Sequence, residues 1–208
     1  MNLIGIDFSI NKPAATIYSN NKYIFYGWPY GLKDKLKDLY RDNGVNIIDR
    51  IDNKNKGDNV SAKLRYEVKN AKYLSNLIFD SISDYLDEDT LIAFEGLSYG
   101  SSGDVVLQLG GYKYILMDTL SSLVPLENMY TYSPITIKKT AGCSERGKSK
   151  KDVIDAFIKF HSKTKFKDAL NNKREDFMKK GNKNWIDHVD DLVDSFWTLE
   201  TLRDKEYN

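Results

Sequence analysis

The first apolar segment of the chain carries a carboxylate in its interior. Residues 1–10 read Met-Asn-Leu-Ile-Gly-Ile-Asp-Phe-Ser-Ile, so Asp7 stands among side chains that favour a buried β-strand. Burying an unpaired carboxylate there costs several kcal/mol. We therefore expect a bound cation or a shared proton to stabilise Asp7.

Further acidic residues stand where they could join Asp7. Glu95 closes a second apolar segment, and an acidic stretch, 187–194, opens the last predicted helix. Within that helix Asp191 and Asp194 are three residues apart, so they project from one face.

Carboxylates gathered from two strands and a helix would suit a divalent metal. Two carboxylates about 4 Å apart repel each other unless they share a proton or bind a cation. Ligands that are all oxygen atoms favour Mg²⁺ or Mn²⁺ over zinc. Two such ions can position a water molecule and stabilise the leaving oxygen in phosphodiester hydrolysis.

Each acid also has an ordinary structural explanation. Asp7 could lie near a turn, Glu95 could end a strand facing water, and the acids of 187–194 could interact with a helix dipole. The order of strand Asp, strand Glu and helix Asp-x-x-Asp favours the metal site. Two alternatives stay open, because Asp190 competes with Asp191 for the first helical position and a His188-x-x-Asp191 register is possible.

Composition predicts one folded domain of ordinary to large size. The 208 residues are 41% hydrophobic and 12% aromatic, enough to bury a core. The single Cys143 excludes an internal disulfide framework and favours a reducing compartment, and a structural zinc site is not expected without a Cys/His cluster.

Apolar runs are far shorter than the roughly 20 residues of a membrane helix. No basic-then-apolar leader is visible, so we expect a cytoplasmic protein.

The formal net charge of +1 hides two basic segments. Residues 138–151 hold six Lys or Arg against one acid, and residues 159–183 hold nine against three. Basic segments beside an acidic pocket are typical of a protein that attracts a polyanion. The alternative is a solvated, lysine-rich surface.

Periodicity predicts the elements that position these side chains, a mixed sheet with helices on its faces. Asn20-Asn21 suits a tight hairpin turn. The expected strands cover residues 2–10, 14–19, 22–28, 45–51, 90–95 and 128–132. The expected helices cover a short part of 31–59 and then 59–86, 105–124, 148–161 and 187–203, with a charged, partly helical connector at 162–184.

These motifs, in this order, resemble the RuvC family of Holliday junction resolvases, within the RNase H-like (retroviral integrase) superfamily. Ile4-Gly-Ile-Asp7-Phe-Ser9 is similar to the family's first-strand motif, and Phe94-Glu95 matches its second acid. Asp191-Leu-Val-Asp194-Ser-Phe-Trp resembles its closing helical signature, in which His sometimes replaces the first Asp.

Two other segments agree with the resemblance. Pro134-Ile-Thr-Ile-Lys138, two glycines and the Lys148-Ser-Lys150-Lys151 run are similar to the segment before the family's penultimate helix. Residues 109–116 stand where the family has a glycine-containing helix. Gly142 and Gly147 are further apart than the family's usual pair, which leaves the register of the lysines open.

The resemblance implies a fold and an activity. The fold would be α/β, an RNase H-like mixed five-stranded sheet with its first three strands antiparallel and helices on both faces. It would form one domain over 1–208, with insertions at about 31–59 and 162–184. The activity would be that of a metal-dependent endodeoxyribonuclease, a crossover junction endonuclease acting on branched DNA in recombination or repair. A homodimer and a bacteriophage or prophage origin would accompany it.

The resemblance also assigns roles to residues. Asp7 would bridge two Mg²⁺ (or Mn²⁺) ions, Glu95 and Asp194 would each hold one, and Asp191 would complete the shell. Lys148 or Lys151 would neutralise the scissile phosphate, unless these lysines only position phosphate or face solvent. The expected DNA contacts are Tyr99, Lys138, Lys139, Arg146, Lys148, Lys150 and Lys151. Either the helix 60–86 or the helix 105–124 would form the dimer interface.

Three rival functions belong to other classes. The first is another nuclease of the superfamily, acting on flaps or on RNA–DNA hybrids. The second is a junction-binding protein without activity. The third is a sugar-kinase or actin-like ATPase, disfavoured because its glycine-rich phosphate loops are not recognisable and 208 residues are too few for two lobes.

Overall fold

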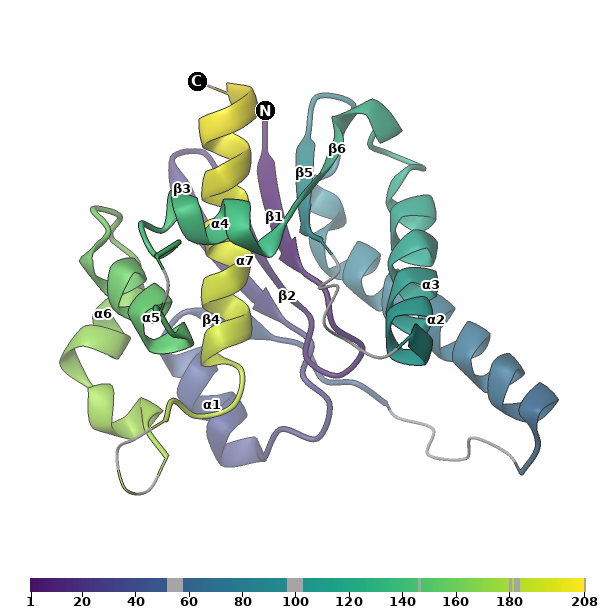
Figure 1. Ribbon diagram of the computed structural model, residues 1–208, viewed down its shortest axis with the longest axis horizontal. Helices are drawn as coiled ribbons and strands as arrows, with labels where there is room; N and C mark the ends of the chain where they lie inside the picture. The colour runs from purple at the N-terminus through teal and green to yellow at the C-terminus, as the bar shows by residue number, and fades with distance from the viewer. Residues whose placement is uncertain (52–57, 97–102, 146, 180, 182–183, 208) are drawn as a thin grey trace.

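A single six-stranded sheet, in the order β4-β3-β2-β1-β5-β6, organises the protein (Figure 1). The computed structural model describes residues 1–207 apart from 52–57, 97–102, 146, 180 and 182–183. Its strands are β1 (Leu3–Asp7), β2 (Ala14–Ser19), β3 (Lys22–Gly27), β4 (Val45–Ile47), β5 (Leu91–Glu95) and β6 (Met129–Tyr132). Its α-helices are α1 (Asp34–Asp42), α2 (Val60–Ile82), α3 (Gly103–Leu120), α4 (Pro134–Thr140), α5 (Lys150–Lys159), α6 (Lys165–Asn172) and α7 (Val189–Leu202).

The sheet brings the carboxyl ends of β1 and β5 together. β1, β2 and β3 are antiparallel, and Asn20 and Asn21 have positive φ angles of 50° and 61°, as a tight hairpin turn requires. β5 pairs with β1 in parallel, with Ile6 opposite Phe94. Asp7 and Glu95, the next residue of each strand, therefore end neighbouring strands at the same edge.

Helices cover both faces of the sheet (Figure 1). Apolar side chains of α2 and α3, among them Leu74 and Leu116, pack with Ile4 and Ile6 on one face. On the other face α7 packs with α5 and α6, and aromatic side chains such as Phe157 and Phe196 fill the space between them. No helix in the described part of the chain combines the length and hydrophobicity that crossing a membrane requires.

The C-terminal helix α7 crosses directly over the first strand. A Cβ atom added at Gly5 would lie 2.3 Å from both the Ser195 carbonyl oxygen and the Leu199 amide nitrogen. The hydroxyl of Thr16, on the neighbouring strand β2, also lies 2.8 Å from the hydroxyl of Ser195. Only glycine permits this approach, which holds the middle of α7 against the middle of β1.

The α/β fold class and the order of the predicted elements are confirmed, with two corrections to the sheet. The five strands implied by the resemblance are one too few, because the strand predicted at 45–51, which covers only Val45–Ile47, pairs in parallel with β3 as a sixth, edge strand. The first strand ends at Asp7 and does not continue to residue 10. Beyond Asp7 the chain turns, and the Ser9 hydroxyl accepts a hydrogen bond of 2.9 Å from the Lys12 amide.

One helix was not predicted, and two begin later than predicted. Ser133 caps α4 by accepting a hydrogen bond from the Thr136 amide, and Pro134 occupies the first turn, where proline is well tolerated. α5 begins at Lys150 because Ser149 and Asp152 form a reciprocal capping box. α7 begins at Val189.

Candidate metal centre

Three carboxylates from distant parts of the chain converge at the edge of the sheet. One oxygen atom from each of Asp7, Glu95 and Asp194 lies within 4.8 Å of those of the other two. β1 and β5 position the first two side chains through their parallel pairing, and the crossing of α7 over β1 positions the third.

Burial and mutual repulsion favour the protonated forms of these acids. Burial raises the pKa of Asp7 well above its ordinary value, and the neighbouring Asp194 and Glu95 raise it further. Burial, with Glu95 next in importance, raises the pKa of Asp194 to about 7. Burial also raises the pKa of Glu95, against the opposing effect of its hydrogen bond with Asp7.

The three side chains fit a divalent cation. Without a cation, the three carboxyl groups avoid mutual repulsion only by staying partly protonated. A bound cation would displace these protons and offset the repulsion between the carboxylates. The ligand atoms are all carboxylate oxygens, which suits Mg²⁺ or Mn²⁺.

Asp191 lies beside this group and is held by a buried histidine. Its Oδ2 atom lies 3.2 Å from the His188 Nδ1 atom, and its charge contributes to raising the pKa of Asp7. His188 is fully buried with a φ of 84°, and its ring packs edge-on against Tyr40. A Cβ at Gly27 would lie 2.1 Å from His188 Nε2, so glycine makes room for the imidazole. His188 thus orients Asp191, and among the described residues it does not belong to the three-carboxylate group.

Asp190 is committed to a different partner. Its Oδ2 atom accepts a hydrogen bond of 2.6 Å from Lys150 Nζ. Burial alone would raise the pKa of Asp190, but this bond holds it below its ordinary value. The pairing makes Asp190 less available to a metal ion than Asp191.

Of the three lysines at 148, 150 and 151, Lys150 acts most directly on the centre. Its charge lowers the pKa of both Glu95 and Asp194. Lys148 is exposed just before α5. Its charge contributes to lowering the pKa of Asp152 and opposes the rise in the pKa of Cys143. Lys151 lines a hollow of about 300 Å³ together with Asp190 and Asp191. The roles predicted for Lys148 and Lys151 stay predictions.

The sequence reasoning missed Lys113, a lysine buried in α3. Its ammonium donates hydrogen bonds to the Glu95 carbonyl oxygen (3.1 Å) and the Thr131 hydroxyl (3.3 Å), and lies 5.2 Å from the centre of the Phe94 ring. Burial lowers the pKa of Lys113 to about 8. A lysine in the otherwise apolar run 112–116 was the available signal.

The predicted DNA contacts lie mostly on exposed surface. Lys138 and Lys139 are exposed on α4, and the charge of Lys138 lowers the pKa of Glu95. Tyr99 and Arg146 fall outside the described residues. These assignments stay predictions.

Solved structures share this arrangement of strands and helices. The structure of Thermus thermophilus RuvC matches with a TM-score of 0.53 and 11% identity, covering 98% of this chain and 96% of that one. The same protein in complex with a Holliday junction substrate matches with a TM-score of 0.52 and 10% identity, covering 98% and 95%. The chain has the RuvC fold.

The remaining comparisons give a weaker structural match and no match by sequence. A Fowlpox virus resolvase in complex with Holliday junction DNA aligns over 100% of both chains with 17% identity and a TM-score of 0.44. No protein-family model and no curated protein matches the sequence. The fold implied by the motifs is therefore established by structure, and the activity must be argued from the site.

Proposed function

We propose that the protein is a metal-dependent endonuclease that cuts branched DNA, with the four-way junction as its preferred substrate. The observation that carries this proposal is the convergence of Asp7, Glu95 and Asp194 at one edge of a RuvC-type sheet. T. thermophilus RuvC has been solved with a Holliday junction substrate, which supports this choice of substrate.

The proposed metal ligands are Asp7, Glu95 and Asp194, with Asp191 completing the set. When bound, two Mg²⁺ or Mn²⁺ ions would supply an activated water and stabilise the leaving oxygen of the phosphodiester. The charges of Asp194, Glu95 and Asp191 all act on Asp7, so Asp7 would be the central ligand of the set. His188 orients Asp191 through its Nδ1 atom.

Nearby lysines would bind the phosphate and hold the ligands. The charge of Lys150 lowers the pKa of Glu95, so Lys150 acts on the metal centre. Lys150 would therefore neutralise the phosphate at the cut, in place of Lys148 or Lys151. Lys138, Lys139 and the other exposed lysines would bind the DNA backbone in a salt-dependent manner. Lys113 is a positioning residue, because it holds the backbone of Glu95 without joining the carboxylate group.

We also infer a homodimer formed through α2 and α3. Val60, Leu64 and Val68 recur every four residues on α2, and their exposed fractions are 74%, 57% and 50%. Leu107 and Tyr114 on α3 are exposed to 76% and 70%. Exposed apolar side chains in such a stripe mark an interaction surface, and a two-fold dimer would present two sites to a two-fold junction.

A cleavage assay on a panel of substrates tests this function. The four-way junction, a flap, a plain duplex and an RNA–DNA hybrid are incubated with Mg²⁺, Ca²⁺ or EDTA. We expect cleavage only with Mg²⁺, and fastest at the junction. Equal cutting of the plain duplex would contradict junction selectivity, and faster cutting of flap or hybrid would assign the protein to another nuclease class. Tight junction binding without any cutting would identify a non-catalytic binding protein.

A further inference from the structure

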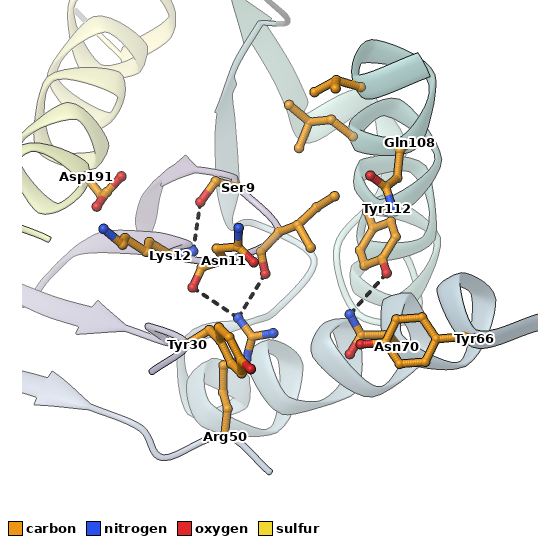
Figure 2. A pocket seen from close by; sticks show the side chains of 13 residues that line it. Ser9, Asn11, Lys12, Tyr30, Arg50, Tyr66, Asn70, Gln108, Tyr112 and Asp191 are labelled. Carbon is orange, nitrogen blue, oxygen red and sulfur yellow. Dashed lines mark hydrogen bonds between the residues drawn. The ribbon is translucent and has the colours of Figure 1, made fainter. Parts of the chain in front are cut away.

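A cavity of about 640 Å³, with both apolar and polar side chains in its wall, lies beside the metal centre (Figure 2). Its walls come from the turn after β1, from α2 and from the first half of α3. The volume lies within the range of small-molecule binding sites, roughly 300–1,000 Å³. Apart from Asp191 at its edge, the residues that line this cavity have no part in the proposed metal centre.

The cavity adjoins a second hollow, lined by two of the proposed catalytic acids. That second hollow, of about 230 Å³, is lined by Asp7 and Glu95. Ser9, Val105 and Leu109 line both spaces, and Asp191 lies at the edge of the larger one. A DNA strand with a phosphate at the carboxylates would therefore place an adjoining nucleotide at the cavity.

Between α2 and α3 the polar part of the wall is made of neutral amides and hydroxyls, from Asn70, Gln108 and Tyr112 (Figure 2). Asn70 donates one hydrogen bond of 3.0 Å to the Tyr112 hydroxyl. Among the described residues, the Asn70 carbonyl oxygen and the Tyr112 hydroxyl proton have no other partner and could bind a ligand. The Gln108 side chain is partly buried and makes no hydrogen bond to the described residues. An amide offers a donor and an acceptor side by side, as the edge of a nucleobase requires.

The cations at the cavity are engaged with protein groups. Arg50 donates hydrogen bonds to the carbonyl oxygens of Ile10 (2.9 Å) and Trp28 (3.2 Å). Lys12 Nζ lies 3.6 Å from a carboxylate oxygen of Asp187. The wall therefore suits an uncharged ring better than a phosphate group.

Two tyrosines supply ring faces for stacking. Tyr30 is 37% exposed, and the Arg50 guanidinium lies 5.9 Å from the centre of its ring. Tyr66 is partly exposed on α2, and in the described part of the chain it contacts no other ring. Stacking on an aromatic side chain is a common way of binding an unpaired base, and Arg50 fixes the wall in advance by tying residues 10 and 28 together.

We propose that this cavity binds a nucleobase that has left the DNA stack, from a nucleotide adjoining the cut. The inference rests on the proposed function for its DNA substrate and goes beyond it by naming the element of DNA that is recognised. A base can enter only after it unpairs and unstacks, which costs least at a branch point or in a single strand. The cavity thus gives the enzyme a physical means of preferring branched DNA over a plain duplex.

A fluorescent base analogue tests the proposal without metal or cleavage. A single-stranded oligonucleotide and a four-way junction, each carrying 2-aminopurine at successive positions, are titrated with protein in EDTA. The variants are Tyr66→Leu and Gln108→Ala. Asn76→Ala is the matched control, since Asn76 is an exposed amide of α2 that does not line the cavity. Thermal melts confirm that each variant is folded.

We expect the wild-type protein to change the fluorescence at one defined position. Tyr66→Leu should weaken binding of that oligonucleotide about tenfold and abolish the fluorescence change, Gln108→Ala should weaken binding severalfold, and Asn76→Ala should match the wild type. Wild-type behaviour of both folded cavity variants, or no position-specific change with the wild type, would overturn the base pocket. Failure of the proposed nuclease function would appear separately, as uncut junction in Mg²⁺.

Discussion

The protonation of three carboxyl groups couples the stability of the protein to pH. Carboxyl groups in an unfolded chain have a pKa near 4, whereas the pKa of Asp194 is about 7 in the folded, metal-free protein and those of Asp7 and Glu95 are also raised. Between about pH 4 and pH 7 the folded state therefore binds more protons than the unfolded state. The free energy of unfolding falls as pH rises through this window.

The metal-free protein should accordingly be less stable at pH 8 than at pH 5.5, by about 1–3 kcal/mol. Urea denaturation in EDTA at the two pH values measures this difference. Mg²⁺ should stabilise the protein more at pH 8, because the ligands are then deprotonated. Asp194→Asn should reduce the pH dependence, and a wild-type free energy that is flat from pH 5.5 to pH 8 would contradict the shared-proton account.

Lys113 gives a second test at the scale of single residues. Lys113→Met keeps the length of the side chain but removes the hydrogen bonds to the Glu95 carbonyl oxygen and the Thr131 hydroxyl. We expect the Mg²⁺ concentration for half-maximal cleavage to rise about tenfold, as for other groups that orient metal ligands. Lys72→Met, at an exposed position of α2, is the control. An unchanged Mg²⁺ dependence in a folded Lys113→Met variant would show that Lys113 only fills space.

At the scale of elements, the contact between β1 and α7 determines where Asp194 lies. Gly5→Ala would place a methyl group 2.3 Å from backbone atoms of Ser195 and Leu199, so α7 must move away from the sheet. We expect the free energy of unfolding to fall by about 3 kcal/mol and cleavage to be lost with it. Urea denaturation measures the first effect.

A second glycine provides the matched control. Gly111 lies in α3, and a Cβ there would meet nothing within 4 Å. Gly111→Ala should be neutral or stabilise the protein by about 1 kcal/mol through helix propensity. If the two substitutions had equal effects, the close crossing of α7 over β1 would not constrain the fold.

The elements also show what sequence can predict. The apolar spacing of α2 and the Asn20-Asn21 turn follow local rules, and both were predicted. The helix α4 was missed although Ser133-Pro134 carries an ordinary capping signal, because the proline suggested only the end of a strand. β4 has three residues, and its place in the sheet depends on pairing with β3, which local sequence does not determine.

The metal centre was predictable in part for a similar reason. Residue type and order singled out Asp7, Glu95 and the helical acids, but only tertiary structure separates Asp190, which pairs with Lys150, from Asp191, which contacts His188. Lys113 was not found, because a lysine within a helix usually faces solvent. The direction of its side chain depends on how α3 packs against the sheet.

At the scale of the whole molecule, the apolar stripe on α2 predicts assembly. Leu64→Glu would place a charge in the centre of the stripe formed by Val60, Leu64 and Val68. We expect this variant to be a folded monomer and the wild type to be a dimer, as measured by sedimentation. Asp80→Lys, at an exposed position near the end of α2, is the control and should remain a dimer. A monomeric wild-type protein that still cuts junctions would contradict the inferred homodimer.

The fold as a whole brings the first strand and the last helix together, so that acids 187 residues apart share one centre. Cleavage of a four-way junction by the Asp7→Asn variant tests the function of that centre most directly, with Mg²⁺, Ca²⁺ and EDTA compared. The substitution removes a central carboxylate with little change in shape, so cleavage in Mg²⁺ should fall by at least about a thousandfold while junction binding in EDTA persists. A cutting rate equal to that of the wild-type protein would contradict the assignment of the metal centre.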